Sequence, residues 1–397
     1  MKILIAATYF PPYASVAVVR VSSLARYLLS KGYEISVLTK KMPEREDIPL
    51  PVGLEGISSI TEVSVNQNDT FFNRSNSYAE TFRSCMKLQK PDCVFITCGT
   101  YETVPLCKIC KDEFNTRVVL DYRDLWIFDM RSKKDFFKPS ELMKKIMFYS
   151  TERKALASAD AVVTVTDGWA DILRKAYPKS RDKIHVIYNG YDDVLFSQIN
   201  SDDRAEAEKL LSKIPDRENA VILASFGKLI YYSYEYGKVL FSAVKKLLEK
   251  YPQLVILHVG QKENNIERLM QETGFPSNHF ICTGFCPYQI GMEILKSADV
   301  NLLIDIRKQA IGTKIYDYIY VNRPVLYCGT KPTYLSELIS GFKGGYVCSD
   351  ENHVINAITE IVSHKNKLLT DEADTKTYSR TIQNCRMEEL LKGNSKK

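Results

Sequence analysis

Several common signatures are missing from this 397-residue sequence, and each missing signature argues against a class of protein. No G-x-G-x-x-G follows an expected strand and no G-x-x-x-x-G-K-S/T loop occurs, which disfavours dinucleotide oxidoreductases and P-loop kinases. No Asp-x-Asp pair follows an expected strand either, so we expect neither an obligatory metal nor another cofactor.

Long apolar runs are also missing. None approaches the ~20 residues that a transmembrane helix needs. The first residues resemble a signal peptide only briefly, because the apolar stretch runs into Pro11 and Pro12 without a small-residue cleavage site. We therefore interpret Lys2–Thr8 as a buried strand and expect a cytoplasmic protein.

Cysteine patterns are sparse although the chain has ten cysteines. Cys107 and Cys110 form a lone C-x-x-C, and no second pair lies at zinc-ribbon spacing. Cys282 and Cys286 are isolated from these. We expect reduced, structural cysteines, with a redox or metal role as the alternative.

Composition is that of an ordinary globular protein, with 45% apolar and 26% charged residues. At roughly 100–200 residues per domain, the length suggests two domains, with three as the alternative. The net charge of +6 permits an anionic ligand or membrane surface without demanding one, and we expect no nucleic-acid partner.

Short apolar runs alternate with longer amphipathic ones, which indicates βαβ units and a parallel sheet. In the first half the expected strands are Lys2–Thr8, Tyr33–Thr39, Asp92–Thr97, Arg117–Asp121, Ala161–Thr166 and Ile184–Ile187, and the expected helices are Val19–Lys31, Ser140–Ser158 and Gly168–Ala176.

The alternation restarts after the Asn189-Gly190 turn. The later expected strands are Val221–Phe226, Leu254–Val259, His279–Thr283, Val300–Ile304 and Val325–Tyr327, and the later expected helices are Tyr236–Tyr251, Asn264–Thr273, Tyr288–Ser297, Lys314–Val321 and Val354–His364.

The pattern therefore predicts an α/β protein with two Rossmann-like, doubly wound parallel-sheet domains. These are residues 1–190 and residues 191–370. A polar tail, residues 371–397, follows, and its last helix is a candidate to pack back on the first domain. Ligands of open α/β sheets bind beyond the carboxyl ends of the strands, so we expect the site in a central cleft between the domains.

The stretch IGTKIYDYIYVNRPVL, residues 311–326, predicts an anion site at the start of a helix. If the helix begins near Thr313, its unpaired N–H groups favour an anion. Gly312 permits close approach, Lys314 suits phosphate, and Asp317 is an acceptor for hydroxyl groups. The alternative is a capped helix with a surface Lys–Asp pair.

The same stretch resembles the donor-binding motif of glycosyltransferase family 4, whose fold is the two-domain GT-B arrangement. In that family a glutamate, seven residues and a second glutamate mark the donor site. Gln309 and Asp317 stand at these two positions. The resemblance implies that Asp317 binds the donor ribose and that Gln309, Gly312 and Thr313 belong to the donor site.

The resemblance covers nearly the whole chain. The first forty residues look like the family's opening strand, loop and helix, although the loop at 13–17 lacks the family's Gly-Gly pair. Small Ser15 still permits close approach there. Arg20 could meet an anionic acceptor or the donor phosphate, or be a solvated helix-start charge. Thr166 ends a strand and would face the cleft, or cap the next helix.

Two stretches of the second half carry further donor contacts by resemblance. Gly227-Lys228 resembles the family's Gly-Arg, so Lys228 and Lys314 would neutralise the diphosphate leaving group. Gly260 and Phe285 lie in turns that resemble those holding the nucleotide base. Where the family has a lysine-glycine pair, this chain has Tyr236-Gly237.

The stretch DYRDLW, Asp121–Trp126, resembles a variant found in bacterial polysaccharide members. Arg123 could contact phosphate and Asp124 could orient the acceptor hydroxyl; a buried Arg–Asp pair is the alternative. No histidine precedes His185, so no histidine near this stretch serves as a base. The family implies retention of configuration, in which the departing phosphate oxygen takes the acceptor proton and catalysis rests on positioning and leaving-group stabilisation.

Residues 131–154 contain eight basic and three acidic residues, a difference of +5, with apolar residues interleaved. This composition is typical of a helix on an anionic membrane, which would make the protein peripheral on the inner face of the cell membrane. An ordinary amphipathic helix over the core has the same pattern.

The resemblance implies a retaining, metal-independent hexosyl- or N-acetylhexosaminyltransferase of surface polysaccharide biosynthesis. It would use a nucleotide-sugar donor, UDP being favoured over GDP by family frequency, and a lipid-linked glycan acceptor. A GT-B nucleotide-sugar epimerase is one alternative. A catalytically inactive sugar-nucleotide-binding protein is another, because of the loop at 13–17, Gln309 and Tyr236. The sugar, the linkage and the oligomeric state do not follow from the sequence.

Overall fold

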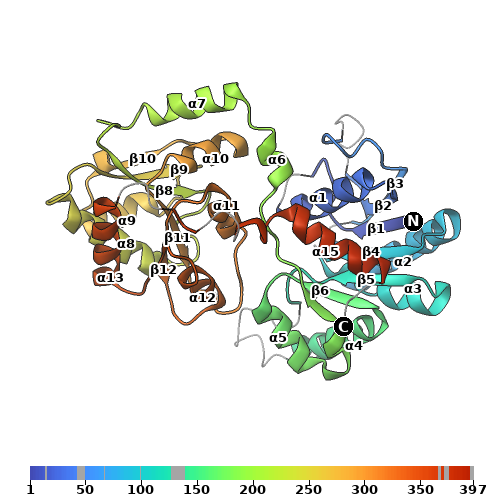
Figure 1. Cartoon of the computed structure of the whole chain (residues 1–397). Coiled ribbons are helices and arrows are strands. Elements are labelled where there is room, and N and C mark those ends of the chain that lie inside the picture. Colours follow the sequence, from blue (N-terminus) through green and yellow to red (C-terminus); the bar gives the residue numbers. More distant parts are fainter. Residues whose placement is uncertain are drawn as a thin grey trace. The chain divides into compact units, whose positions relative to one another are not determined.

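The chain divides into two compact units, each built around one sheet (Figure 1). Our computed structural model describes residues 1–13, 16–42, 50–66, 68–98, 100–126, 139–364, 368–370 and 375–393. The first unit comprises Met1–Asn189 together with Arg380–Lys397, and the second comprises Gly190–Ser379. The division falls at the Asn-Gly turn, where Gly190 has a φ of +63°.

The first unit contains a seven-stranded sheet with the order β3-β2-β1-β4-β5-β6-β7. Every neighbouring pair is parallel. The strands are β1 (Lys2–Ala7), β2 (Glu34–Lys40), β3 (Ser59–Val63), β4 (Cys93–Thr97), β5 (Arg117–Asp121), β6 (Ala161–Thr164) and β7 (Ile184–Val186). The helical segments are α1 (Val16–Ser30), α2 (Phe71–Gln89), η2 (Tyr101–Thr103), α3 (Leu106–Phe114), α4 (Pro139–Ser158), α5 (Asp167–Ala176), η4 (Pro178–Lys183) and α15 (Arg380–Lys392).

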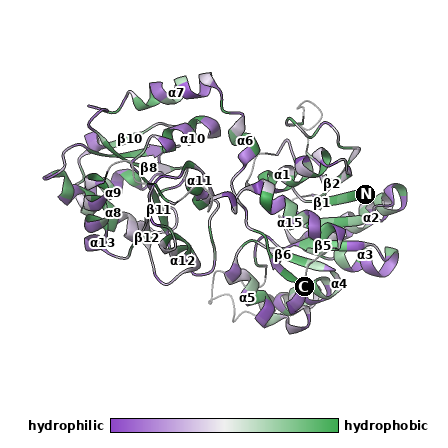
Figure 2. Ribbon diagram, in the orientation of Figure 1, coloured by the Kyte–Doolittle hydropathy of each residue, from purple (hydrophilic) through white to green (hydrophobic). Residues whose placement is uncertain are grey.

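Apolar side chains of this sheet alternate between two cores, one on each face. From β1, Leu4 joins the core under α2 and α3, while Ile3 joins the core under α1 and α15. Because both faces are covered, the central strands are apolar throughout, and Figure 2 colours them as hydrophobic. The carboxylate of Glu388 on α15 accepts hydrogen bonds from the hydroxyls of Tyr27 (2.8 Å) and Tyr33 (2.6 Å), which ties this last helix to the first unit.

The second unit contains a six-stranded parallel sheet with the order β10-β9-β8-β11-β12-β13. Its strands are β8 (Val221–Phe226), β9 (Leu254–Val259), β10 (Phe280–Cys282), β11 (Val300–Asp305), β12 (Val325–Gly329) and β13 (Gly345–Cys348). Its helical segments are α6 (Asp193–Ser197), α7 (Ser201–Leu211), α8 (Tyr234–Leu248), α9 (Ile266–Thr273), η5 (Ser277–His279), α10 (Tyr288–Lys296), α11 (Lys314–Val321), α12 (Tyr334–Ser340) and α13 (Glu351–Ser363).

Both sheets are doubly wound, which confirms the predicted fold class. In each, the chain runs from a central strand to one edge and then returns to build the other side. The strand order therefore reverses between β1 and β4 in the first unit and between β8 and β11 in the second. In such sheets, ligands bind beyond the carboxyl ends of the strands at this reversal.

Three further observations concern membranes, metals and thiols. Within the described residues, no helix is both long and apolar enough to cross a membrane. Nor do three or more histidine, cysteine, aspartate or glutamate side chains gather there as they would to hold a metal ion. All ten cysteines are free, and most of them are buried.

Candidate functional site

In the second unit, helix α11 begins beyond the carboxyl end of β11. Thr313 holds the position before the helix, and its side chain caps no backbone N–H. At Gly312, an added Cβ would lie 3.0 Å from Nη2 of Arg307, so glycine leaves room for that guanidinium. The start of α11 is therefore a turn of small residues beside a cation.

Lys314 reaches from α11 to the loop after β8. Its Nζ donates a hydrogen bond to the backbone carbonyl of Lys228. Surrounding protein desolvates the ammonium group and lowers the pKa of Lys314 to about 8, although nearby carboxylates, chiefly that of Glu263, act in the opposite direction. The side chain of Lys228 is exposed, and Gly227 before it has a φ of +71°. The structure thus brings the two predicted lysines to one place.

Asp317 lies one turn after Lys314 and is held by α10. Its carboxylate accepts a hydrogen bond from the hydroxyl of Tyr288, the first residue of that helix. The ring of Tyr288 packs against Phe226 at the end of β8, with centroids 5.7 Å apart, and stacks on Phe196 at 5.5 Å. The carboxylate is therefore oriented at the carboxyl edge of the sheet.

The remaining donor candidates also follow strands of the second unit. Gly260, after β9, has a φ of +138°, and a Cβ there would lie 3.4 Å from the Cα of Gly227. The positive φ values of Gly227 and Gly260 favour glycine at both positions. Phe285, after β10, is 80% exposed, and Gln309, between β11 and α11, is exposed.

Three residues at this edge were missed by sequence reasoning. Glu263 accepts hydrogen bonds from the backbone N–H groups of Leu229 (2.5 Å) and Ile230 (3.0 Å), which fixes the loop that carries the first lysine. Arg307 forms an ion pair with Asp305 at 2.6 Å. Arg307 directly follows β11, and because α/β sheets bind ligands beyond the carboxyl ends of their strands, its position in the sequence could have identified it.

The third missed residue is His258, which is fully buried in β9. Its Nδ1 lies 2.9 Å from the hydroxyl of Ser225, and its Nε2 lies 3.1 Å from the carbonyl oxygen of Gln261. Since a carbonyl only accepts, Nε2 carries the proton and the serine donates to Nδ1. Burial lowers the pKa of His258, so the neutral ring links two loops of the edge.

In the first unit, Arg20 is buried and engaged within the protein. Nε and Nη2 of its guanidinium donate hydrogen bonds to the carboxylate of Asp121, the closest at 2.9 Å. Its Nη1 donates to the carbonyl of Tyr188 at 3.0 Å. Thr97 also donates to this carboxylate at 2.9 Å. The predicted solvated charge at the helix start is thus a buried ion pair between α1 and the end of β5.

Arg123 and Asp124 follow β5 and are close to each other. Nε of Arg123 lies 3.6 Å from Oδ2 of Asp124, and the two side chains are 14% and 52% exposed. The loop that carries them is anchored by Glu152 of α4, a fully buried carboxyl group that accepts hydrogen bonds from Tyr122 and Tyr177. Burial raises the pKa of Glu152 to about 7.

The other two acceptor candidates have different outcomes. Thr166 is buried, and its hydroxyl accepts a hydrogen bond from the backbone N–H of Trp169 at 3.1 Å, so it caps α5. Ser15 lies outside the described residues. Residues 131–138 of the basic segment lie outside them as well, and Lys145 of its remaining part is buried.

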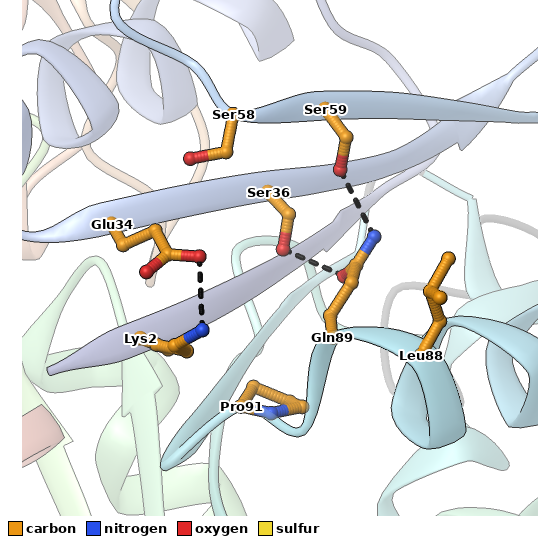
Figure 3. Close-up of a pocket in the computed structure, with 8 residues that line it drawn as sticks. All are labelled: Lys2, Glu34, Ser36, Ser58, Ser59, Leu88, Gln89 and Pro91. Carbon is orange, nitrogen blue, oxygen red and sulfur yellow. Dashed lines mark hydrogen bonds and ion pairs between the residues drawn. The ribbon is translucent and has the colours of Figure 1, made fainter.

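Figure 3 shows a hollow at the amino edge of the first sheet. Its polar groups satisfy one another: Ser36 donates to Gln89 at 2.7 Å, Gln89 donates to Ser59 at 3.0 Å, and Lys2 pairs with Glu34 at 3.3 Å. It lies at the edge where α/β sheets do not bind ligands. We assign it no function.

Comparisons with known proteins give a family likeness for residues 17–194 and a fold for the whole chain. Residues 17–194 match the family described as Glycosyltransferase Family 4. None of the curated proteins compared with the chain matches it. A glycosyltransferase from Rickettsia africae ESF-5 superposes with a TM-score of 0.70 at 16% identity, over 100% of this chain and 98% of that one.

Two further solved structures share the architecture over 99% of this chain and 100% of their own. Anabaena HepE, in complex with UDP and glucose, has a TM-score of 0.64 at 14% identity. UDP-GlcNAc 2-epimerase from Neisseria meningitidis, bound to UDP-GlcNAc, has a TM-score of 0.66 at 14% identity. Residues 17–194 therefore resemble glycosyltransferase family 4, and the whole chain has the GT-B fold of these solved structures.

Proposed function

We propose that the protein transfers a sugar from a nucleotide-sugar donor to a glycan acceptor. The observation that carries this proposal is the convergence of Lys228, Lys314 and Asp317 at the carboxyl edge of β8 and β11. Ammonium groups suit a diphosphate, and a carboxylate accepts hydrogen bonds from ribose hydroxyls. A nucleoside diphosphate linked to a sugar presents both chemical groups.

The remaining residues of the edge complete a donor site. Because Gly227 and Gly260 have no side chains, the backbone of the two loops would contact the nucleotide directly. Gly312, Thr313 and Gln309 lie next to Lys314, where the sugar would follow the diphosphate. Phe285 would contact the base from an exposed position.

A UDP-sugar is the donor class that we favour over a GDP-sugar. Anabaena HepE was crystallised with UDP and the Neisseria epimerase with UDP-GlcNAc, and both have this fold. These complexes support UDP as the nucleotide of the donor. Because a fold does not determine its chemistry, they do not distinguish a hexosyl from an N-acetylhexosaminyl group as the transferred sugar.

The chemistry that we propose is retaining. The bond between the anomeric carbon and the diphosphate oxygen breaks, a bond to the acceptor oxygen forms on the same face, and the acceptor proton goes to the departing phosphate oxygen. Lys228 and Lys314 stabilise the charge that develops on the diphosphate, as preorganised cations do. Arg123 would contact phosphate, and Asp124 would orient the acceptor hydroxyl. These roles need no metal.

We further propose that the acceptor is a lipid-linked glycan of surface polysaccharide biosynthesis. Helix α4 exposes the apolar side chains of Met143 (65%), Ile146 (57%) and Met147 (41%). Their spacing places them on one face of the helix. Together with the basic excess of residues 131–154, this face suits the inner, anionic surface of a cell membrane.

Nucleotide binding and the fate of the donor test the proposed function. Calorimetry should show binding of UDP, and NMR should show slow release of UDP from a UDP-hexose in a panel of nucleotide sugars. A stereoisomer of the sugar still attached to UDP would indicate an epimerase. Binding without either reaction would indicate an inactive binding protein, and no nucleotide binding at all would overturn the proposal.

A further inference from the structure

A hollow of about 590 Å³ lies within the first unit at the carboxyl edge of β1, β2, β3 and β4. This is the ligand-binding edge of the sheet, beside the point where its strand order reverses. The side chains that line the hollow come from the ends of these strands and from α2 and η2. None of the site residues predicted from the sequence belongs to it.

The charged side chains of the hollow are mostly cationic. Lys40 and Lys41 line it at the end of β2, and Arg74 lines it from α2. Among the described lining residues, Glu102 carries the only carboxylate, which leaves an excess of two positive charges (three minus one). An anionic ligand is therefore favoured over a neutral or cationic one.

Glu102 has one carboxylate oxygen that lacks a partner. The residue is only 6% exposed. Its Oε1 accepts a hydrogen bond from Nε of Arg74 at 2.6 Å, and Arg74 is itself held by the carbonyl of Asp69 at 2.7 Å. Its Oε2 is buried and accepts no hydrogen bond from the part of the chain that the structure describes. A buried acceptor of this kind is satisfied when a ligand supplies a hydroxyl.

Two stacked tyrosines form another wall of the hollow. The rings of Tyr9 and Tyr13 have centroids 4.6 Å apart and an interplanar angle of 21°. Burial raises the pKa of Tyr9, Tyr13 and Glu102 raise it further, and Arg123 and Arg74 act in the opposite direction. An aromatic ring with a polar end suits the C–H face and hydroxyls of a sugar.

An aromatic cluster lies next to the lining residue Glu102. Tyr101, the residue before Glu102, stacks on Trp126 at 4.9 Å with an interplanar angle of 9°, and Trp126 contacts Phe148 of α4 at 4.8 Å. These ring contacts connect η2, which contributes Glu102 to the hollow, with helix α4.

We propose that this hollow binds an anionic saccharide, with its acidic group against Lys40 and Lys41, a hydroxyl on Glu102 and its ring against Tyr9 and Tyr13. The inference rests on the proposed function, because this saccharide would be the acceptor. The acid could be the phosphate of a lipid-diphosphate-linked sugar or the carboxylate of a uronic acid. Both present a negative charge beside a sugar ring.

The test measures binding of small probes while UDP saturates the donor site. The probes are N-acetylglucosamine 1-phosphate, glucuronic acid, uncharged N-acetylglucosamine and inorganic phosphate, followed by ligand-observed NMR at low salt. We expect at least one anionic sugar to bind about tenfold or more tightly than both the neutral sugar and inorganic phosphate. A preference for the sugar phosphate would assign the acid to a lipid diphosphate, and a preference for glucuronic acid would assign it to the glycan.

Variants locate the binding. Lys40→Ala combined with Lys41→Ala should weaken anionic-sugar binding about tenfold, whereas Lys87→Ala, a change of an exposed lysine on α2, should not. Glu102→Gln should weaken binding of the anionic sugar too, with thermal melting to show that the unit stays folded. Equal binding of charged and neutral sugars, or an unchanged lysine variant, would overturn the inference. Inorganic phosphate binding as well as the sugar phosphate would also overturn it.

Failure of the inference is distinguishable from failure of the proposed function. If wild-type protein binds UDP and no anionic sugar at millimolar concentration, the inference alone fails. If wild-type protein does not bind UDP, the proposed function fails, whether or not the sugar probes bind.

Discussion

The hydroxyl of Tyr288, at the start of α10, donates a hydrogen bond to the carboxylate of Asp317 on α11. A carboxylate has about four acceptor positions, so this bond leaves room for ribose hydroxyls. It also selects one orientation of the carboxylate before any nucleotide arrives. The two residues are 29 positions apart, and two helices of the same sheet edge bring them together.

Asp317→Asn should weaken UDP binding by on the order of tenfold to a hundredfold, because losing a charged acceptor costs ~1.5–3 kcal/mol. Asp317→Glu should be tolerated better. Tyr288→Phe should cost only ~0.5–1.5 kcal/mol, since it removes orientation and keeps the charge. Calorimetry with UDP and with its 2′,3′-dideoxyribose analogue measures this. If wild-type protein binds both ligands equally, Asp317 does not contact the ribose and only provides a favourable charge at the start of the helix.

The affinity for UDP should fall as pH rises through about 8. Lys314 has a pKa of about 8, lowered from 10.5 by desolvation, so the cation that meets the diphosphate disappears above that pH. Lys314→Arg should remove this fall, because arginine stays charged. The free energy of unfolding should change in the opposite sense: between about pH 8 and 10.5 the unfolded chain binds a proton that the folded chain has released, so stability should rise.

Lys314→Ala is the companion change for catalysis. Turnover with a donor should drop by an amount equivalent to ~2–4 kcal/mol of transition-state stabilisation. Thermal stability should not fall with it, because the substitution removes a desolvated charge. Unchanged turnover together with normal UDP affinity would remove Lys314 from the site.

Arg20→Met should destabilise the first unit by roughly 3–5 kcal/mol, because it leaves the buried carboxylate of Asp121 without its cation. The double change Arg20→Met with Asp121→Asn should recover part of this loss. Denaturant unfolding of both variants supplies the measurement. If Arg20→Met unfolds like wild type but loses transfer, the guanidinium acts on a ligand and the ion pair is secondary.

Met143→Glu combined with Ile146→Glu should release the protein from vesicles of phosphatidylglycerol. Each lost apolar contact is worth up to ~1.5–3 kcal/mol when fully buried, so at least a tenfold loss of binding is expected. The matched control is Leu88→Glu on α2, which is 83% exposed and lies outside the basic segment. Co-sedimentation with the vesicles at low salt measures this binding. If wild-type protein does not co-sediment with them, the membrane proposal is wrong.

The sequence by itself determined most strands of the two sheets and the helix that starts the candidate donor site. Val221–Phe226, Leu254–Val259 and Lys314–Val321 were predicted with their observed bounds, because a strand buried on both faces and a helix with one apolar face leave a local periodic pattern. Strand β3 left no such pattern. It is the edge strand of its sheet, and most of its side chains are only partly buried.

Only the tertiary structure decided the partners of the polar side chains. Arg20 and Asp121 are 101 positions apart, and they meet because α1 covers the sheet at the end of β5. The anchoring of a loop by Glu263 and the hollow beside Glu102 likewise depend on which strands are neighbours. Periodicity reports which face of an element is buried, but the choice of a partner depends on strand order, and strand order is a property of the assembled sheet.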